Sequence, residues 1–169
     1  MTREEKFMQE AIDLSLHGIT NNEGGPFGCV IVQGDKIIGR GNNKVTSTND
    51  PTAHAEIVAI RDACKNIGSF QLEGCEVYTS CEPCPMCLGA IYWARPKVIY
   101  FANNREDAAA IGFARRPSRG AVRGSGTTQR ARSAEPRQYR RAPRAAESTF
   151  QHGRAAPLAP HPRPDAGPW

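Results

Sequence analysis

The stretch His54-Ala55-Glu56, followed further along the chain by Pro83-Cys84-Pro85-Met86-Cys87, brings together side chains that bind zinc in proteins. Imidazole and thiolate are common zinc ligands, and His54, Cys84 and Cys87 supply them here. A structural zinc normally has four protein ligands, whereas a catalytic zinc keeps one coordination position open for water. Three ligands beside a carboxylate therefore predict a hydrolytic site that holds one Zn²⁺ per chain.

The alternative for this cluster is a structural zinc site. A fourth ligand from Cys75, Cys81 or His17 would complete it. For an isolated cysteine pair this alternative would be preferred, but the His-Ala-Glu element favours catalysis, because H-x-E followed by P-C-x-x-C is the signature of zinc deaminases that act on nucleobases.

Three longer stretches of sequence show which group of zinc deaminases the chain resembles. They are Gly24 to Gly28 (GGPFG), Asn49 to Glu56 (NDPTAHAE) and Thr79 to Arg95 (TSCEPCPMCLGAIYWAR). Over residues 1–113 the chain resembles the cytidine deaminase-like superfamily of zinc deaminases, and within it the bacterial guanine deaminases. The Tyr92-Trp93 neighbourhood distinguishes it from the usual tRNA adenosine deaminases.

The resemblance implies hydrolytic deamination of guanine to xanthine and ammonia, a step of purine catabolism and salvage, in a homodimeric enzyme. Glu56 would be the catalytic proton shuttle, taking a proton from water, delivering it to a ring nitrogen and later protonating the departing amine. Without such a shuttle, ammonia is a poor leaving group.

The substrate-binding residues are also expected from the resemblance. Asn43 matches an asparagine that hydrogen-bonds the base, although a turn asparagine is the alternative. Phe27 matches an aromatic wall of the base pocket, although a phenylalanine at the start of a strand is often a core residue. The backbone amide of Ala55, near a helix start, is a candidate partner of the substrate or intermediate.

Two other functions remain open at this stage. A tRNA adenosine deaminase would share the zinc signature and use a basic tail for RNA. A protein that binds zinc but catalyses nothing is the other. The distribution of charge argues against the tRNA adenosine deaminase. Residues 1–114 contain 10 Lys and Arg and 14 Asp and Glu, whereas residues 115–169 contain 12 Arg and 3 acidic residues. The net charge of +5 therefore reflects the tail, and the acidic body should not attract polyanions.

Six cysteines invite a disulfide interpretation, because their number is even. However, the amino-terminal residues lack the apolar stretch of a secretory signal, and no run approaches the about 20 apolar residues of a membrane span. We therefore expect free thiols, no membrane association and a cytoplasmic location.

The periodicity of apolar residues predicts a three-layer α/β/α sandwich with a mixed sheet. A helix is expected to start at Asp50-Pro51, since Asp caps helices and Pro fits the first turn. The other predicted elements are helices at 4–17, at 84–94 and from 106, a hairpin of 27–32 with 36–41, and strands at 76–79 and 97–102.

The composition changes after Phe113. Residues 114–169 are rich in Arg, Ala, Pro and Gly, and eight prolines in residues 115–169 interrupt any helical period. We expect this tail to be disordered. An out-of-frame translation of a GC-rich gene is the preferred explanation, and an RNA-binding arm is the alternative. In the similar guanine deaminases, an acidic residue after the Gly112-Phe113 equivalent recognises guanine, and Ala114 cannot replace it.

Overall fold

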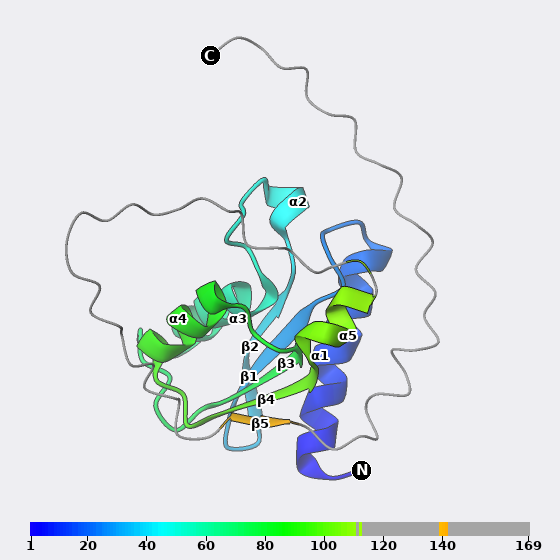
Figure 1. Cartoon of the computed structure of the whole chain (residues 1–169). Helices are drawn as coiled ribbons and strands as arrows, with labels where there is room; N and C mark the ends of the chain where they lie inside the picture. The colour runs from blue at the N-terminus through cyan, green and yellow to red at the C-terminus, as the bar shows by residue number, and fades with distance from the viewer. Residues whose placement is uncertain (111, 113–138, 142–169) are drawn as a thin grey trace, which may run out of the picture.

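The computed structural model describes residues 1–110, 112 and 139–141, and its central layer is one mixed sheet (Figure 1). The strand order is β2-β1-β3-β4-β5. β1 pairs antiparallel with β2 and β3, whereas the pairs β3 with β4 and β4 with β5 are parallel. The strands are β1 (Gly28–Gln33), β2 (Lys36–Asn42), β3 (Glu76–Cys81), β4 (Val98–Asn103) and β5 (Tyr139–Arg141).

Helices cover both faces of this sheet, and the predicted three-layer α/β/α sandwich is confirmed. In Figure 1, α1 lies on one side of the sheet and α3 and α4 lie together on the other. The helices are α1 (Arg3–Thr20), α2 (Val45–Thr48), α3 (Ala55–Ile67), α4 (Pro85–Ala94) and α5 (Arg105–Ala110). No helix within the described residues is long and apolar enough to cross a membrane.

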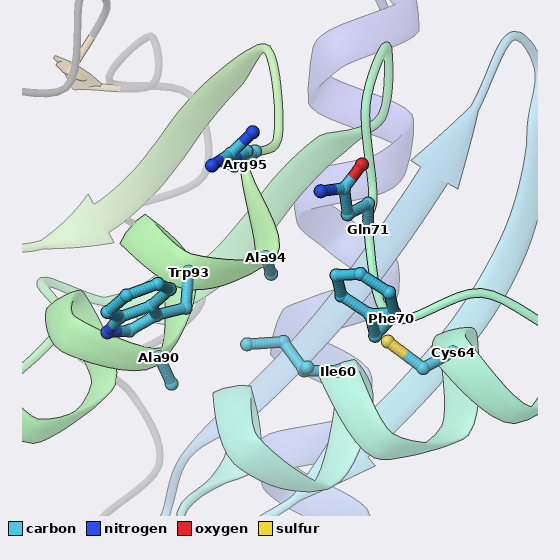
Figure 2. Close-up of a pocket in the computed structure, with 8 residues that line it drawn as sticks. All are labelled: Ile60, Cys64, Phe70, Gln71, Ala90, Trp93, Ala94 and Arg95. Atoms are coloured by element: carbon cyan, nitrogen blue, oxygen red, sulfur yellow. The ribbon is translucent and has the colours of Figure 1, made fainter.

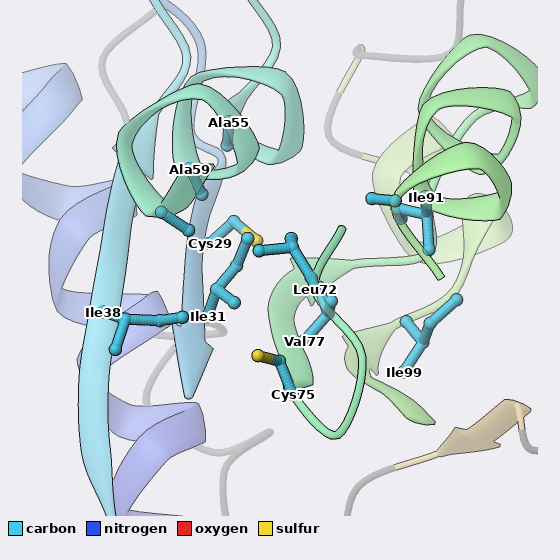
Figure 3. Close-up of a cluster of buried hydrophobic side chains, with 12 residues drawn as sticks. Cys29, Ile31, Ile38, Ala55, Ala59, Leu72, Cys75, Val77, Ile91 and Ile99 are labelled. Atoms are coloured by element: carbon cyan, nitrogen blue, oxygen red, sulfur yellow. The ribbon is translucent and has the colours of Figure 1, made fainter. Parts of the chain in front are cut away.

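The interior strand β1 is apolar on both faces, and its alternating side chains divide the core in two. Cys29 and Ile31 pack toward α3 and α4 (Figure 3), whereas Val30 and Val32 pack against α1. All four side chains are fully buried. A strand buried on both faces requires a helical layer on each side, which is why the sandwich forms.

The first helix is held at its start by a capping box and a charged contact. Thr2 accepts the backbone amide of Glu5, and the Glu5 carboxylate accepts the backbone amide of Thr2. Arg3 then reaches Glu76 of β3 at 2.7 Å, which ties α1 to the sheet.

Small residues bring α3 close to β2. A Cβ atom on Gly39 would lie 2.5 Å from the carbonyl oxygen of Ala59, and one on Gly41 would lie 2.3 Å from that of Ala55. Such distances leave no room for any side chain at these two strand positions. The absence of side chains there therefore sets the position of α3, and with it the residues at the start of that helix.

One predicted boundary is wrong: the second long helix begins at Ala55, not at Asp50-Pro51. Asp50 forms a local turn in which its Oδ1 atom accepts the amide of Thr52 at 2.8 Å and its hydroxyl at 2.7 Å. An aspartate can satisfy such a turn as well as a helix end, so the Asp-Pro signal was ambiguous. The helix instead starts after His54, and the short α2 was not predicted.

The expected disorder of the tail falls largely outside the described residues. Tyr139–Arg141 are an exception, because they form β5 parallel to β4, and no strand was predicted there. The remaining predicted elements are present, with ends shifted by a few residues.

Candidate metal centre and catalytic site

His54 and Cys84 occupy equivalent positions, each immediately before a helix. His54 is the residue that precedes α3 (φ −69°, ψ 157°), and Cys84 precedes α4 (φ −71°, ψ 167°). Because both backbones are extended, the helical angle of about 100° per residue does not apply between His54 and Glu56. The histidine and the carboxylate can therefore face one site although they are two positions apart.

The three potential ligands converge. The Nδ1 atom of His54 lies 3.6 Å from the Sγ atoms of both Cys84 and Cys87, and the three ligand atoms lie within 4.8 Å of one another. In tetrahedral coordination, Zn–S bonds of about 2.3 Å and Zn–N bonds of about 2.0 Å place nitrogen and sulfur about 3.5 Å apart. The observed separations fit that arrangement.

Within the part of the chain that the structure describes, this group contains three ligands only. Cys75, Cys81 and His17, the candidates for a fourth, are not part of it. Cys81 instead directs its thiol at the carbonyl oxygen of Asn104, 3.7 Å away. A three-ligand set corresponds to a metal site with an open coordination position.

The two thiols of the cluster differ in acidity. Hydrogen bonds, first with the Cys87 thiol and then with His54, lower the pKa of Cys84 to about 3. The hydrogen bond to Cys84, together with burial, raises the pKa of Cys87. The lowered pKa makes Cys84 the thiolate of the pair. That thiolate is ready to bind a cation.

Glu56 lies beside the ligands and is almost fully buried, with 6% of its surface exposed. Burial is the main reason why its pKa is raised, and a hydrogen bond with the Cys87 side chain opposes that shift. A buried carboxyl of this kind can hold a proton next to the metal centre and release it to a neighbour.

Backbone hydrogen bonds place Asn43 and Phe27 near the segment that precedes His54. The amide of Asn43 donates to the carbonyl oxygen of Phe27 at 3.0 Å, and the next amide, of Lys44, donates to Ala53 at 2.9 Å. Asn43 therefore lies alongside the segment that leads into His54. Phe27 packs against the core cluster under α3 and α4, and Ala55 is the fully buried first residue of α3.

Sequence reasoning missed the residues that hold this region together. Glu23 accepts a hydrogen bond from the Asn42 side chain at 2.6 Å, and Asn42 is buried. The only signal in the sequence was the combination of adjacent asparagines with a double glycine, which does not specify a contact.

A separate groove of about 440 Å³ lies on the outer side of α3 and α4 (Figure 2). None of the cluster residues line it, so it is distinct from the metal centre. Its walls carry exposed aromatic side chains, among them Phe70 and Trp93, which are 79% and 73% exposed.

Comparison with known proteins identifies the domain. The sequence pattern of the cytidine and deoxycytidylate deaminase zinc-binding region matches residues 1–103. The chain belongs to this family. Its zinc-binding deaminase pattern, together with the His/Cys/Cys group, gives the protein a site for one Zn²⁺.

Two relatives of the chain are named as deaminases of different substrates. The chain is 58% identical to a guanine deaminase of Bacillus subtilis over 109 residues, which are 64% of this chain and 70% of that protein. It is 40% identical to a tRNA-specific adenosine deaminase of Buchnera aphidicola over 105 residues, 62% of this chain and 69% of that protein.

A solved structure agrees with the first relative. The crystal structure of guanine deaminase from Bacillus subtilis is 48% identical and superposes with a TM-score of 0.66, over 73% of this chain and 85% of that one. The fold and the deaminase family therefore agree between sequence and structure.

Proposed function

We propose that this protein is a hydrolytic guanine deaminase, which converts guanine and water to xanthine and ammonia. The observation that carries this proposal is the His54–Cys84–Cys87 group beside the buried Glu56, in a chain 58% identical to a guanine deaminase. Zinc deaminases place these residue types in these roles.

His54, Cys84 and Cys87 are proposed to hold the zinc ion, and Glu56 to move the protons. Bound zinc lowers the pKa of a water molecule towards neutrality and makes it a nucleophile. The Glu56 carboxylate accepts a proton from the attacking water and delivers it to a ring nitrogen of the base. Once the water oxygen is bonded to C2, Glu56 takes the remaining proton of that oxygen and gives it to the amine. The bond between C2 and the amine nitrogen then breaks, and ammonia leaves.

The base is proposed to lie between Phe27 and Asn43, with the start of α3 at its reacting edge. Amides in the first turn of a helix have no partner within the helix, so the backbone at Ala55 can donate to the substrate or intermediate. The Asn43 side chain supplies a hydrogen bond that orients the base.

Guanine is preferred over a tRNA adenosine as substrate for two reasons. Identity to the guanine deaminase is 58%, against 40% for the tRNA-specific adenosine deaminase. The acidic balance of residues 1–114 also opposes binding to a polyanion, because phosphate contacts depend on Lys and Arg.

The decisive experiment follows xanthine formation from guanine by ultraviolet absorbance with zinc-loaded protein. We expect turnover by the wild type and a loss of more than about 100-fold in Glu56→Ala, in line with the usual contribution of a general acid–base. Glu73→Ala, an exposed glutamate, is the matched control and should retain activity. Deamination of a tRNA anticodon stem-loop without activity on guanine would instead establish the RNA enzyme.

We also propose that the deaminase domain spans residues 1–113 and that two copies associate through α4. This helix contains no charged residue, and it exposes Tyr92 and Trp93 to solvent, as expected of a helix that another chain covers. Light scattering should detect a dimer that Trp93→Glu weakens. A wild-type protein that stays monomeric at high concentration would refute the association.

The proposed location is the cytoplasm, in purine metabolism. All six cysteines are free thiols, which suits a reducing compartment. Residues 114–138 and 142–169 lie outside the described residues, so the out-of-frame origin of this tail stays a prediction. Sequencing of the gene around the codon for Phe113 checks it.

A further inference from the structure

The Asn43 side chain is held in one orientation by two backbone amides. Its Oδ1 atom accepts hydrogen bonds from the amides of Gly25 at 3.3 Å and Val45 at 3.1 Å. Backbone N–H groups only donate, so the oxygen must face them and the side-chain nitrogen must face away. In a reversed carboxamide, the side-chain NH₂ group would face the two backbone N–H groups, and none of these groups could accept a hydrogen bond.

The Nδ2 group of Asn43 is thereby left for another partner. Asn43 is 7% exposed, and every fully buried side-chain nitrogen or oxygen in the described residues has a hydrogen-bond partner. Within the described residues no hydrogen bond joins Nδ2 to a partner, so in that part of the chain this group is available to a ligand. It is a donor without acceptor capacity at the position proposed to contact the base.

The loop of residues 23–25 fixes this arrangement from both sides of Asn43. Glu23 accepts the Asn42 side chain at 2.6 Å, and its backbone carbonyl accepts the Ser47 amide at 3.3 Å. Between them, a Cβ atom on Gly24 would lie 2.2 Å from the Asn43 carbonyl oxygen and 2.5 Å from its Oδ1 atom. The loop therefore contacts the residues before and after Asn43 and fits only without a side chain at Gly24.

We propose that the 23–25 loop is a positioning element that fixes Asn43 as a hydrogen-bond donor, so that the pocket selects bases with an acceptor at that edge. This inference rests on the proposed function, since it names what sets the base preference of the same site. The Glu23 carboxylate contacts Asn42 and lies 3.9 Å from the Lys44 ammonium, the two neighbours of Asn43, so Glu23 is a positioning residue.

The kinetic test is a double-mutant cycle with guanine as substrate. Glu23→Ala should lower kcat/KM about tenfold, the effect of one misplaced hydrogen bond, mainly through KM. Glu23→Gln retains a side-chain oxygen for Asn42 and should stay near wild type. In an Asn43→Ala background, the loss caused by Glu23→Ala should disappear, because the side chain through which it acts is gone.

A second measurement needs no turnover. In zinc-loaded wild type, the amides of Gly25 and Val45 should be protected from hydrogen exchange, and Asn43→Ala should remove that protection. Glu23→Ala should reduce it at Gly25, and Gly24→Ala should do the same. Zinc content and thermal midpoint identify any variant that has lost its fold.

The outcomes separate the two proposals. Two results would overturn the positioning role even if guanine is the substrate. One is a tenfold loss of kcat/KM by Glu23→Ala that persists in the Asn43→Ala background, and the other is a hydrogen-exchange rate of the Gly25 amide that Asn43→Ala leaves unchanged. A wild type that does not deaminate guanine refutes the proposed function, and the exchange data then decide the role of the loop alone.

Discussion

The backbone of Gly41 in β2 approaches Ala55 in α3 so closely that a Cβ atom on residue 41 would lie 2.3 Å from the Ala55 carbonyl oxygen. Ala55 immediately follows His54, so the contact between strand and helix sets the position of a metal ligand. The zinc site thus depends on a glycine that contacts neither the metal nor the proposed substrate.

Gly41→Ala should therefore weaken both the fold and zinc binding. The added methyl group would push α3 away from the sheet, with a cost of about 1–3 kcal/mol, typical of overpacking. Chemical denaturation and competition with a zinc chelator measure the two effects. Gly89→Ala is the control, because a Cβ atom there meets nothing within 4 Å. Equal stability and zinc affinity in Gly41→Ala would contradict the assignment.

Cys84→Ala should abolish stoichiometric zinc while the fold persists. Even loss of an outer partner of a ligand lowers metal affinity about 10–100-fold, and loss of a direct ligand should cost more. Elemental analysis after dialysis gives the zinc content, and circular dichroism reports the fold. Cys64→Ala removes a thiol outside the cluster and should retain one zinc. Retention of tight zinc in Cys84→Ala would exclude this ligand set.

Arg3→Ala should destabilise the protein by about 1.5–3 kcal/mol, the range for hydrogen bonds to charged groups. Arg3 bonds Glu76 and Asp35, each at 2.7 Å, and its guanidinium lies 5.0 Å from the Phe7 ring centre. Arg3→Lys should recover part of the loss, because lysine keeps the positive charge but lacks the planar guanidinium that bonds two carboxylates at once. Arg40→Ala, at an exposed strand position, is the control. A wild-type denaturation midpoint in Arg3→Ala would argue against this contact.

Stability should fall as the pH rises above about 10. Burial, followed by the hydrogen bond to Glu76, raises the pKa of Tyr78 above its usual value. The unfolded chain therefore loses this proton at a pH where the folded protein still holds it, so rising pH favours unfolding. Tyr78→Phe should show a shallower decline than wild type in denaturation at alkaline pH.

Tyrosinate absorbance offers an independent check of the same shift. While the protein stays folded, wild type and Tyr78→Phe should show the same change in near-ultraviolet absorbance between about pH 9 and 11, because Tyr78 stays protonated. One additional tyrosine titrating in the wild type over that range would show that Tyr78 ionises normally.

The layers of the fold could be predicted from sequence because each depends on a local pattern. The apolar run of β1 and the helical spacing of the apolar residues in α1 are readable without tertiary information. The start of α3 was not readable in the same way. Asp50-Pro51 is compatible with a helix start and with the turn that Asp50 forms with Thr52, and only packing against β2 decides between them.

For the candidate site, the residue types were predictable and the geometry was not. The spacing of His54, Cys84 and Cys87 pointed to a metal, but whether a fourth ligand joined them required coordinates. The contact between Glu23 and Asn42 joins residues 19 positions apart, and neither residue belongs to a motif. Contacts of this kind depend on how loops meet, which periodicity does not encode.

The two ligand-bearing helices have their far ends well away from the chemistry. α3 ends at Ile67 with Gly68 in the left-handed conformation, and α4 ends at Ala94 with Arg95 in the same conformation. Because His54 and Cys84 each precede the first turn, a change in the length of either helix at its far end leaves both ligands where they are. The exposed residues 68–70, which precede the buried Leu72, are consequently a place where inserted sequence, or a reporter domain, can be accommodated without retuning the metal centre.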